Sequence, residues 1–82
     1  MSVEDAIRKI VAGNAKLSRP AASLTATTDL FEAGLDSQAV VNVMLAVEEH
    51  FGFEFPEDRL NRASFATLSS IADIVASAGA AA

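Results

Sequence analysis

The sequence predicts an all-α fold: a small four-helix bundle of three longer helices and one short helix, with a long loop between helices one and two. Three segments carry apolar residues at intervals of three and four, which is the spacing of one helix face. Residues that favour helix ends flank these segments. No segment shows the sustained alternation that a half-buried strand requires. We expect a single domain over residues 1–78 and a flexible tail at residues 79–82.

The first helix is predicted to follow Ser2, which precedes Asp5 by three residues in a pattern that resembles a capping box. Its apolar face consists of Val3, Ala6, Ile7, Ile10 and Val11. Pro20 disfavours helix at the residue before it, and a long connection then occupies residues 18–36. A connection of this length in a compact domain indicates a functional or self-packed loop. Its apolar anchors are Leu24, Leu30, Phe31 and Leu35.

The second helix is predicted to begin at Ser37, with Asp36 as its N-cap, and to end at Gly52. One face carries Val40, Met44, Val47 and Phe51. Further apolar residues, namely Val41, Val43, Leu45 and Ala46, extend well beyond one stripe. The helix is therefore either central to the bundle or partly covered by another molecule.

The remaining chain predicts one short and one longer helix. Pro56 is expected to open a brief helix over residues 57–61 as a first-turn proline, after a turn that carries Phe53 and Phe55 inward. Either Ser64 or Thr67 is expected to cap the last helix. The predicted buried face of that helix is Phe65, Leu68, Ile71, Ala72 and Val75.

Composition excludes several classes of function. All charged side chains from Asp29 to Asp58 are acidic, so this segment would repel nucleic-acid phosphates. These acids form either a solvated surface or a negative face that attracts basic partner proteins. No apolar run approaches the roughly 18 residues of a membrane span, and no signal peptide is evident. We expect a cytoplasmic monomer that binds neither nucleic acid nor membrane.

Metal and nucleophile chemistry fit the residues poorly. Asp29 and Gly34 imitate the start of an EF-hand loop, but Val40 stands where the bidentate glutamate belongs. The chain has no cysteine and one histidine, His50, which cannot build a usual zinc site. His50 is also roughly 20 Å from Ser37 along the same predicted helix, too far to act as its base. We expect no metal site and no catalytic residue.

Ser37 admits two further interpretations. A hydroxyl in the first turn of a helix is unhindered, and a phosphate esterified to it would lie near unpaired backbone N–H groups. Gly34 gives the preceding turn the backbone freedom to present it. Alternatively, Ser37 simply starts the helix, since serine is common there. The residues alone leave both interpretations open.

The stretch DLFEAGLDS at residues 29–37 resembles the D-L-x-x-x-G-x-D-S signature of acyl carrier proteins and related peptidyl or aminoacyl carrier domains. The similarity extends through VMLAVEEHFGFEFPEDRL and FATLSSIADIV, and so covers nearly the whole chain. It implies that Ser37 carries a 4′-phosphopantetheine arm taken from coenzyme A. The arm would supply the thiol that a cysteine-free chain lacks, and would hold acyl or aminoacyl groups as thioesters.

The resemblance also implies partners: a phosphopantetheinyl transferase, an acyl- or amino-acid-activating ligase and a downstream acyltransferase or synthase. These enzymes would bind the second helix and the loop before it. The recognition residues that we expect are Leu35, Asp36, Gln38, Val41 and Asn42.

Departures from the family pattern decide between types of carrier. After the serine the family often has Leu or Met and then acids, whereas this chain has Gln38, Ala39 and Asn42. A thinner acidic stripe favours a stand-alone carrier loaded by a dedicated ATP-dependent activating enzyme. The alternatives are a fatty-acid or polyketide type carrier and a helical protein-interaction module without a prosthetic group. The cargo itself stays open, because the enzymes choose it.

Overall fold

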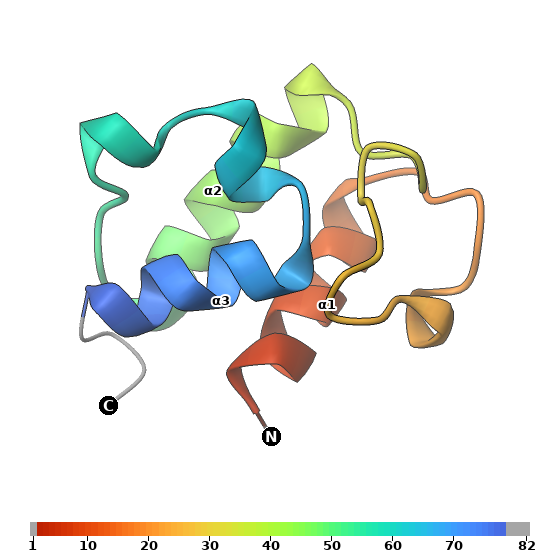
Figure 1. The fold of residues 1–82 in the computed structure, drawn as a ribbon, viewed down its shortest axis with the longest axis horizontal. Coiled ribbons are helices and arrows are strands. Elements are labelled where there is room, and N and C mark those ends of the chain that lie inside the picture. The colour runs from red at the N-terminus through yellow and green to blue at the C-terminus, as the bar shows by residue number, and fades with distance from the viewer. Residues whose placement is uncertain (1, 79–82) are drawn as a thin grey trace.

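The structure, a computed structural model, describes residues 2–78 (Figure 1). Its α-helices are α1 (Val3–Asn14), α2 (Ser37–Phe51) and α3 (Leu68–Ser77). Single turns of 3-10 helix form η1 (Ala21–Ser23), η2 (Glu57–Arg59) and η3 (Arg62–Phe65). No strand occurs in this part of the chain, which confirms the all-α prediction. The predicted tail at residues 79–82 lies outside the described residues.

The predicted short helix over residues 57–61 is confirmed only in part, because it is a 3-10 turn that ends at Arg59. The structure has the 3-10 turn η2 there, and a second turn, η3, follows it. Pro56 is extended and precedes η2 instead of occupying its first turn. Asn61 is extended as well, and its side chain accepts a hydrogen bond of 3.0 Å from the N–H of Ser64. Because Asn61 starts a new turn, the previous one cannot continue.

Helices α1 and α2 begin and end largely as the sequence predicts. The Ser2 hydroxyl accepts a hydrogen bond of 3.1 Å from the N–H of Asp5, and the Asp36 carboxylate accepts one of 2.8 Å from the N–H of Ala39. Gly52 ends α2 in the left-handed conformation, with φ at 71°. These bonds satisfy backbone groups that the helix itself leaves unpaired.

The buried face of α2 differs from the predicted one. The buried residues are Ala39, Val43 and Val47, whereas Val40, Met44 and Phe51 are only partly buried. Apolar residues cover more than one face of α2, so helix periodicity alone could not predict which face packs against the core.

Helix α3 is capped by Thr67, the second of the two predicted caps. Thr67 and Ser70 form a reciprocal capping box. Ser64, the other candidate, is buried inside η3. Phe65 also belongs to η3 and not to α3, although it is buried as predicted.

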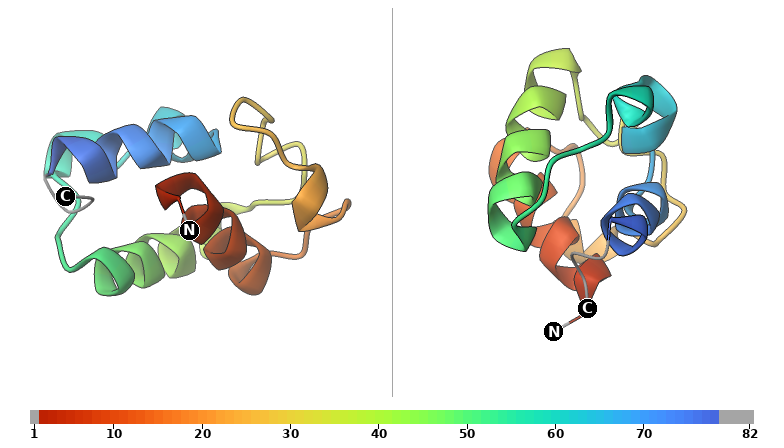
Figure 2. Two further views of the ribbon diagram at one scale, coloured as in Figure 1. Left: turned by 90° about the horizontal axis from the view of Figure 1, so that it is seen from below. Right: turned by 90° about the vertical axis from the view of Figure 1, so that its left-hand side faces the viewer.

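The core lies where α1 packs against both α2 and α3 (Figure 2). Burying a large apolar side chain contributes about 1.5–3 kcal/mol. The largest fully buried side chains come from every helix and from the long loop: Ile7, Val11, Leu30, Val43, Val47, Phe65, Leu68, Ile71 and Val75. No helix between residues 2 and 78 is both long enough and apolar enough to cross a membrane.

The connection between α1 and α2 is a self-packed loop. Leu24, Leu30 and Leu35 are buried, as predicted, while Phe31 is partly exposed. Backbone hydrogen bonds tie the loop to itself, to the link after η3 and to α3: Ser18 N–H to Ala33 O at 2.7 Å, Leu30 N–H to Ala66 O at 2.8 Å and Ser69 N–H to Ala26 O at 3.0 Å. The loop therefore delivers residues 35–37 to the start of α2 at a fixed position.

Candidate functional site

The turn before Ser37 is built by the residues of the DLFEAGLDS motif. The Asp29 carboxylate accepts a hydrogen bond of 2.9 Å from the N–H of Phe31, and so starts the turn. Leu30 and Leu35 are buried and joined by a backbone hydrogen bond of 2.9 Å from the Leu35 N–H. Asp36 then caps α2. The hydrogen bonds and buried leucines of the motif thus determine where α2 begins.

Gly34 is required by the geometry of this turn. Its φ is +125°, a region that residues with a side chain rarely adopt. A Cβ there would also collide with the backbone carbonyl oxygen of Lys16. The close approach joins the two ends of the long loop, next to the hydrogen bond from Ser18 to Ala33.

Ser37 is exposed in the first turn of α2. Within residues 2–78 its hydroxyl makes no side-chain hydrogen bond. His50 lies in the last turn of the same helix, where its ring packs edge-on against Phe51 at 4.7 Å. The hydroxyl of Ser37 is therefore free to be modified but has no histidine base beside it.

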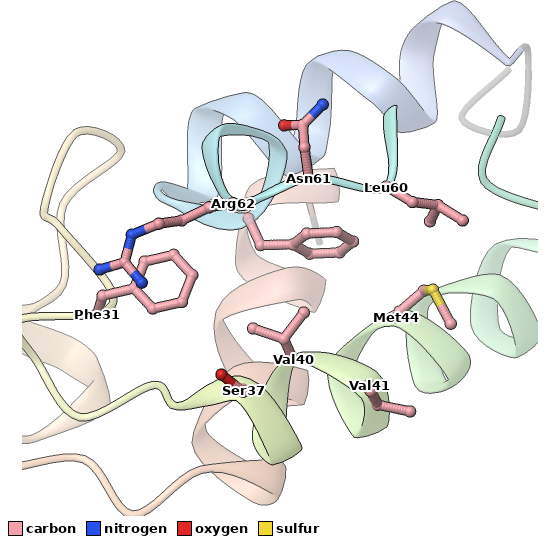
Figure 3. A pocket seen from close by; sticks show the side chains of 9 residues that line it. Phe31, Ser37, Val40, Val41, Met44, Leu60, Asn61 and Arg62 are labelled. Carbon is pink, nitrogen blue, oxygen red and sulfur yellow. The ribbon is translucent and has the colours of Figure 1, made fainter. Parts of the chain in front are cut away.

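A groove of about 340 Å³ opens beside Ser37, between α2 and the segment of η2 and η3 (Figure 3). Most of its wall is apolar. Its lining residues are Phe31, Ser37, Val40, Val41, Met44, Leu60, Asn61, Arg62 and Phe65. In Figure 3 Ser37, Phe31 and Arg62 gather toward one end, and Leu60 and Met44 toward the other.

The predicted recognition residues divide among three locations. Val41 is 49% exposed on the rim of the groove. Asp36, Gln38 and Asn42 line a separate hollow of about 280 Å³ with the end of α1. Leu35 is 3% exposed and belongs to the core, so its prediction as a surface contact is corrected here. The Leu35 side chain points inward because it anchors the turn before the Asp36 cap in the apolar core.

The expected recognition residues left out several residues near Ser37. Leu45, which the sequence placed only among the extra apolar residues of this helix, is 53% exposed and follows Val41 by one helical turn, so helix periodicity could have added it. Leu60 and Arg62 come from the opposite wall of the groove. No local sequence signal places them near Ser37, because their proximity depends on how η2 and η3 pack.

Residues 5–76 match the family described as "Phosphopantetheine attachment site". The chain belongs to this family. It is 45% identical over 69 residues to an aminoacyl carrier protein of Agrobacterium fabrum, a match that covers 84% of this chain and 83% of that protein. The carrier-protein resemblance and 4′-phosphopantetheine as its prosthetic group are thereby confirmed.

Solved structures of similar chains share the fold. A carrier protein from Agrobacterium tumefaciens, crystallised with an engineered Bradyrhizobium japonicum glycine:[carrier protein] ligase and ATP, superposes with a TM-score of 0.85 at 42% identity. That match covers 90% of this chain and 96% of the other. The holo acyl carrier protein of Nitrosomonas europaea superposes with a TM-score of 0.82 at 37% identity, covering 94% and 95%.

The residues present fit a phosphopantetheine group. The group needs an accessible hydroxyl, and the Ser37 hydroxyl is exposed and without a side-chain hydrogen bond in the described chain. The neighbouring groove offers an apolar wall and, at its Ser37 end, the guanidinium of Arg62. The apolar wall suits the aliphatic part of the group, and the guanidinium suits its phosphate.

Proposed function

We propose that this chain is a carrier protein that holds an aminoacyl or acyl group on a 4′-phosphopantetheine arm attached to Ser37 and presents it to partner enzymes. The observation that carries the proposal is the position of Ser37. It is exposed directly after the Asp36 cap, at one end of an apolar groove, in a motif whose other residues build the turn. The group would supply the reactive thiol at which the cargo is held.

In this proposal the residues of the chain hold the arm and present its cargo, and none of them is catalytic. Ser37 provides the oxygen that is esterified. Gly34 and Asp36 fix the backbone on which that oxygen is carried. A hydroxyl that follows a hydrogen-bonded turn and a capped helix start would be offered to each partner enzyme in the same place, which lowers the entropic cost of every encounter.

We propose that an ATP-dependent amino-acid-activating ligase loads the carrier. Support comes from the similar chain that was crystallised with a glycine:[carrier protein] ligase, and from the similarity to an aminoacyl carrier protein. The surface of α2 fits such a partner through Val41 and Leu45, which are exposed apolar residues one turn apart. Gln38 and Asn42 are uncharged, so docking would depend on shape and apolar contact more than on ion pairs.

The remaining parts of this proposal concern setting and partners. The chain would work as a single carrier domain over residues 1–78 in the cytoplasm. A phosphopantetheinyl transferase would attach the arm, and an acyltransferase or synthase would receive the cargo. Asp36, Gln38, Val41 and Asn42 would form the recognition surface, since Leu35 is buried.

Intact mass tests the attachment. The protein is incubated with coenzyme A and a broad-specificity phosphopantetheinyl transferase, alongside Ser37→Ala and the control Ser69→Ala, which changes a serine on α3. We expect the parent and the control to gain one phosphopantetheine and Ser37→Ala to gain none. No gain by a folded parent would favour the interaction module without a prosthetic group.

Loading tests the type of carrier. The modified protein is incubated with ATP, glycine and a glycine:[carrier protein] ligase, and separately with a fatty acid and an acyl-activating ligase. A mass gain with the amino acid that hydroxylamine reverses supports the aminoacyl carrier. Loading by the fatty acid alone would favour the fatty-acid or polyketide alternative.

A further inference from the structure

The groove beside Ser37 has an unusual charge for this protein. The chain has a formal net charge of −5, and its charged residues from Asp29 to Asp58 are all acidic. Among the described residues that line the groove, however, Arg62 alone carries a charge, and that charge is positive. The positive charge of Arg62 in this groove would attract an anionic group.

Arg62 is positioned but not neutralised. Its Cζ lies 3.8 Å from the centre of the Phe31 ring, a cation–π contact that restricts the otherwise flexible side chain. The ion pairs found within residues 2–78 both belong to Arg8, so Arg62 has no carboxylate partner in that part of the chain. The guanidinium therefore keeps its capacity to donate to an anion.

The attachment site creates a need for such a cation. A phosphodiester on Ser37 would add a permanent negative charge directly next to the Asp36 carboxylate. That carboxylate already accepts from the N–H of Ala39, so it occupies one of the donors at the start of α2. The two like charges repel each other, and a guanidinium is the side chain best suited to offset this by hydrogen bonding to a phosphate.

We propose that Arg62, held against the Phe31 ring, is the electrostatic contact of this chain for the phosphodiester of a group attached to Ser37. The inference rests on the proposed function, because it needs the arm to be on Ser37. Arg62 would thus be a positioning residue that keeps the first part of the arm along the groove. Since the pair is solvent-exposed, we expect it to change the population of the ordered arm by about two- to fivefold.

The test uses the full chain carrying the arm, with modification verified by intact mass. The parent is compared with Arg62→Gln and with Arg59→Gln, which removes an exposed cation of η2 that does not line the groove. The ³¹P resonance of the phosphodiester, the ¹⁵N resonances of the arginine Nε–H groups and the relaxation of the arm are measured at low and high ionic strength. Unmodified protein is titrated with inorganic phosphate in parallel.

We expect attachment of the arm to shift the Arg62 Nε–H but not that of Arg59. Arg62→Gln should shift the ³¹P resonance and loosen the arm, and high salt should move the parent toward this variant. A fully modified parent with an unchanged Arg62 resonance would overturn the inference alone. So would an equal response of Arg62 to free phosphate, which would assign the cation to a soluble anion. Absence of mass gain at Ser37 would instead overturn the proposed function.

Discussion

Gly34 lies directly against the backbone carbonyl of Lys16, where no Cβ can be accommodated. This approach closes the long loop between α1 and α2 at the point where the chain turns toward Ser37. Gly34 therefore helps to position the hydroxyl of Ser37, which follows it by three residues.

Gly34→Ala is expected to destabilise the protein by about 2–4 kcal/mol, because alanine would be strained at φ +125° and the added methyl group meets Lys16. Gly13→Ala is the matched control. A Cβ at Gly13 meets nothing within 4 Å in helix α1, so alanine should stabilise by about 0.5–1 kcal/mol. Urea unfolding measures both, and equal effects of the two variants would contradict this account.

Substitutions can separate the capping role of Asp36 from the recognition role that we propose for it. Asp36→Ala removes the acceptor of the Ala39 N–H and should cost about 1 kcal/mol of stability. Asp36→Asn retains a good capping residue and should be nearly as stable as the parent. If the charge serves recognition, Asp36→Asn will nevertheless be modified more slowly by the transferase, which a time course of intact mass measures. Unchanged modification of the asparagine variant would limit Asp36 to its capping role.

Glu48 anchors the chain after α2. Its carboxylate accepts a hydrogen bond of 2.8 Å from the N–H of Phe55. Phe55 lies just before η2, and its side chain is buried in the core. Glu48→Ala should cost about 1–2 kcal/mol, because a partly buried N–H loses its partner. Glu49→Ala, at the exposed neighbouring position, should change stability by less than about 0.5 kcal/mol. Thermal unfolding of the two variants compares the effects, and equal costs would show that the hydrogen bond contributes nothing.

Leu45 is the best candidate for an apolar docking contact beyond the motif. It is 53% exposed one turn after Val41, so Leu45→Ala should leave the fold intact. If the ligase covers this face of α2, kcat/KM for loading should fall about five- to thirtyfold. The control Ala76→Ser alters an exposed residue of α3, away from Ser37, and should load normally. Normal loading of both variants would place the ligase on another surface.

Asp5 should give the N-terminus of α1 a measurable pH dependence. The hydrogen bond with Ser2, and after it the contact with Arg8, hold the pKa of the Asp5 carboxyl below its usual value of 3.8. A depressed pKa in the folded state stabilises the fold above pH 3.8, and this contribution is lost as the pH falls through the lowered pKa. NMR titration of the Asp5 side chain should show the depression, and Ser2→Ala should raise the pKa toward 3.8. A pKa at or above 3.8 in the parent would refute this.

Much of the fold and part of the site could be predicted because the signals are local. Ser2, Asp36 and Thr67 cap helices through bonds to residues only three positions away. Such bonds are encoded in a few consecutive residues and need no knowledge of the rest of the chain. The length and type of the short helix after Pro56 could not be predicted, because propensity does not distinguish a single 3-10 turn from the start of a longer helix.

The residues around Ser37 are enough to show that it begins a helix directly after a capping aspartate, in a motif that resembles those of carrier proteins. The side chains that surround Ser37 in space depend on the tertiary structure. Leu35 is buried, and Arg62 reaches Phe31 from the far wall of the groove. Contacts between residues so distant in sequence depend on how the loop and the 3-10 turns pack on α2, and no local pattern of residues specifies that packing.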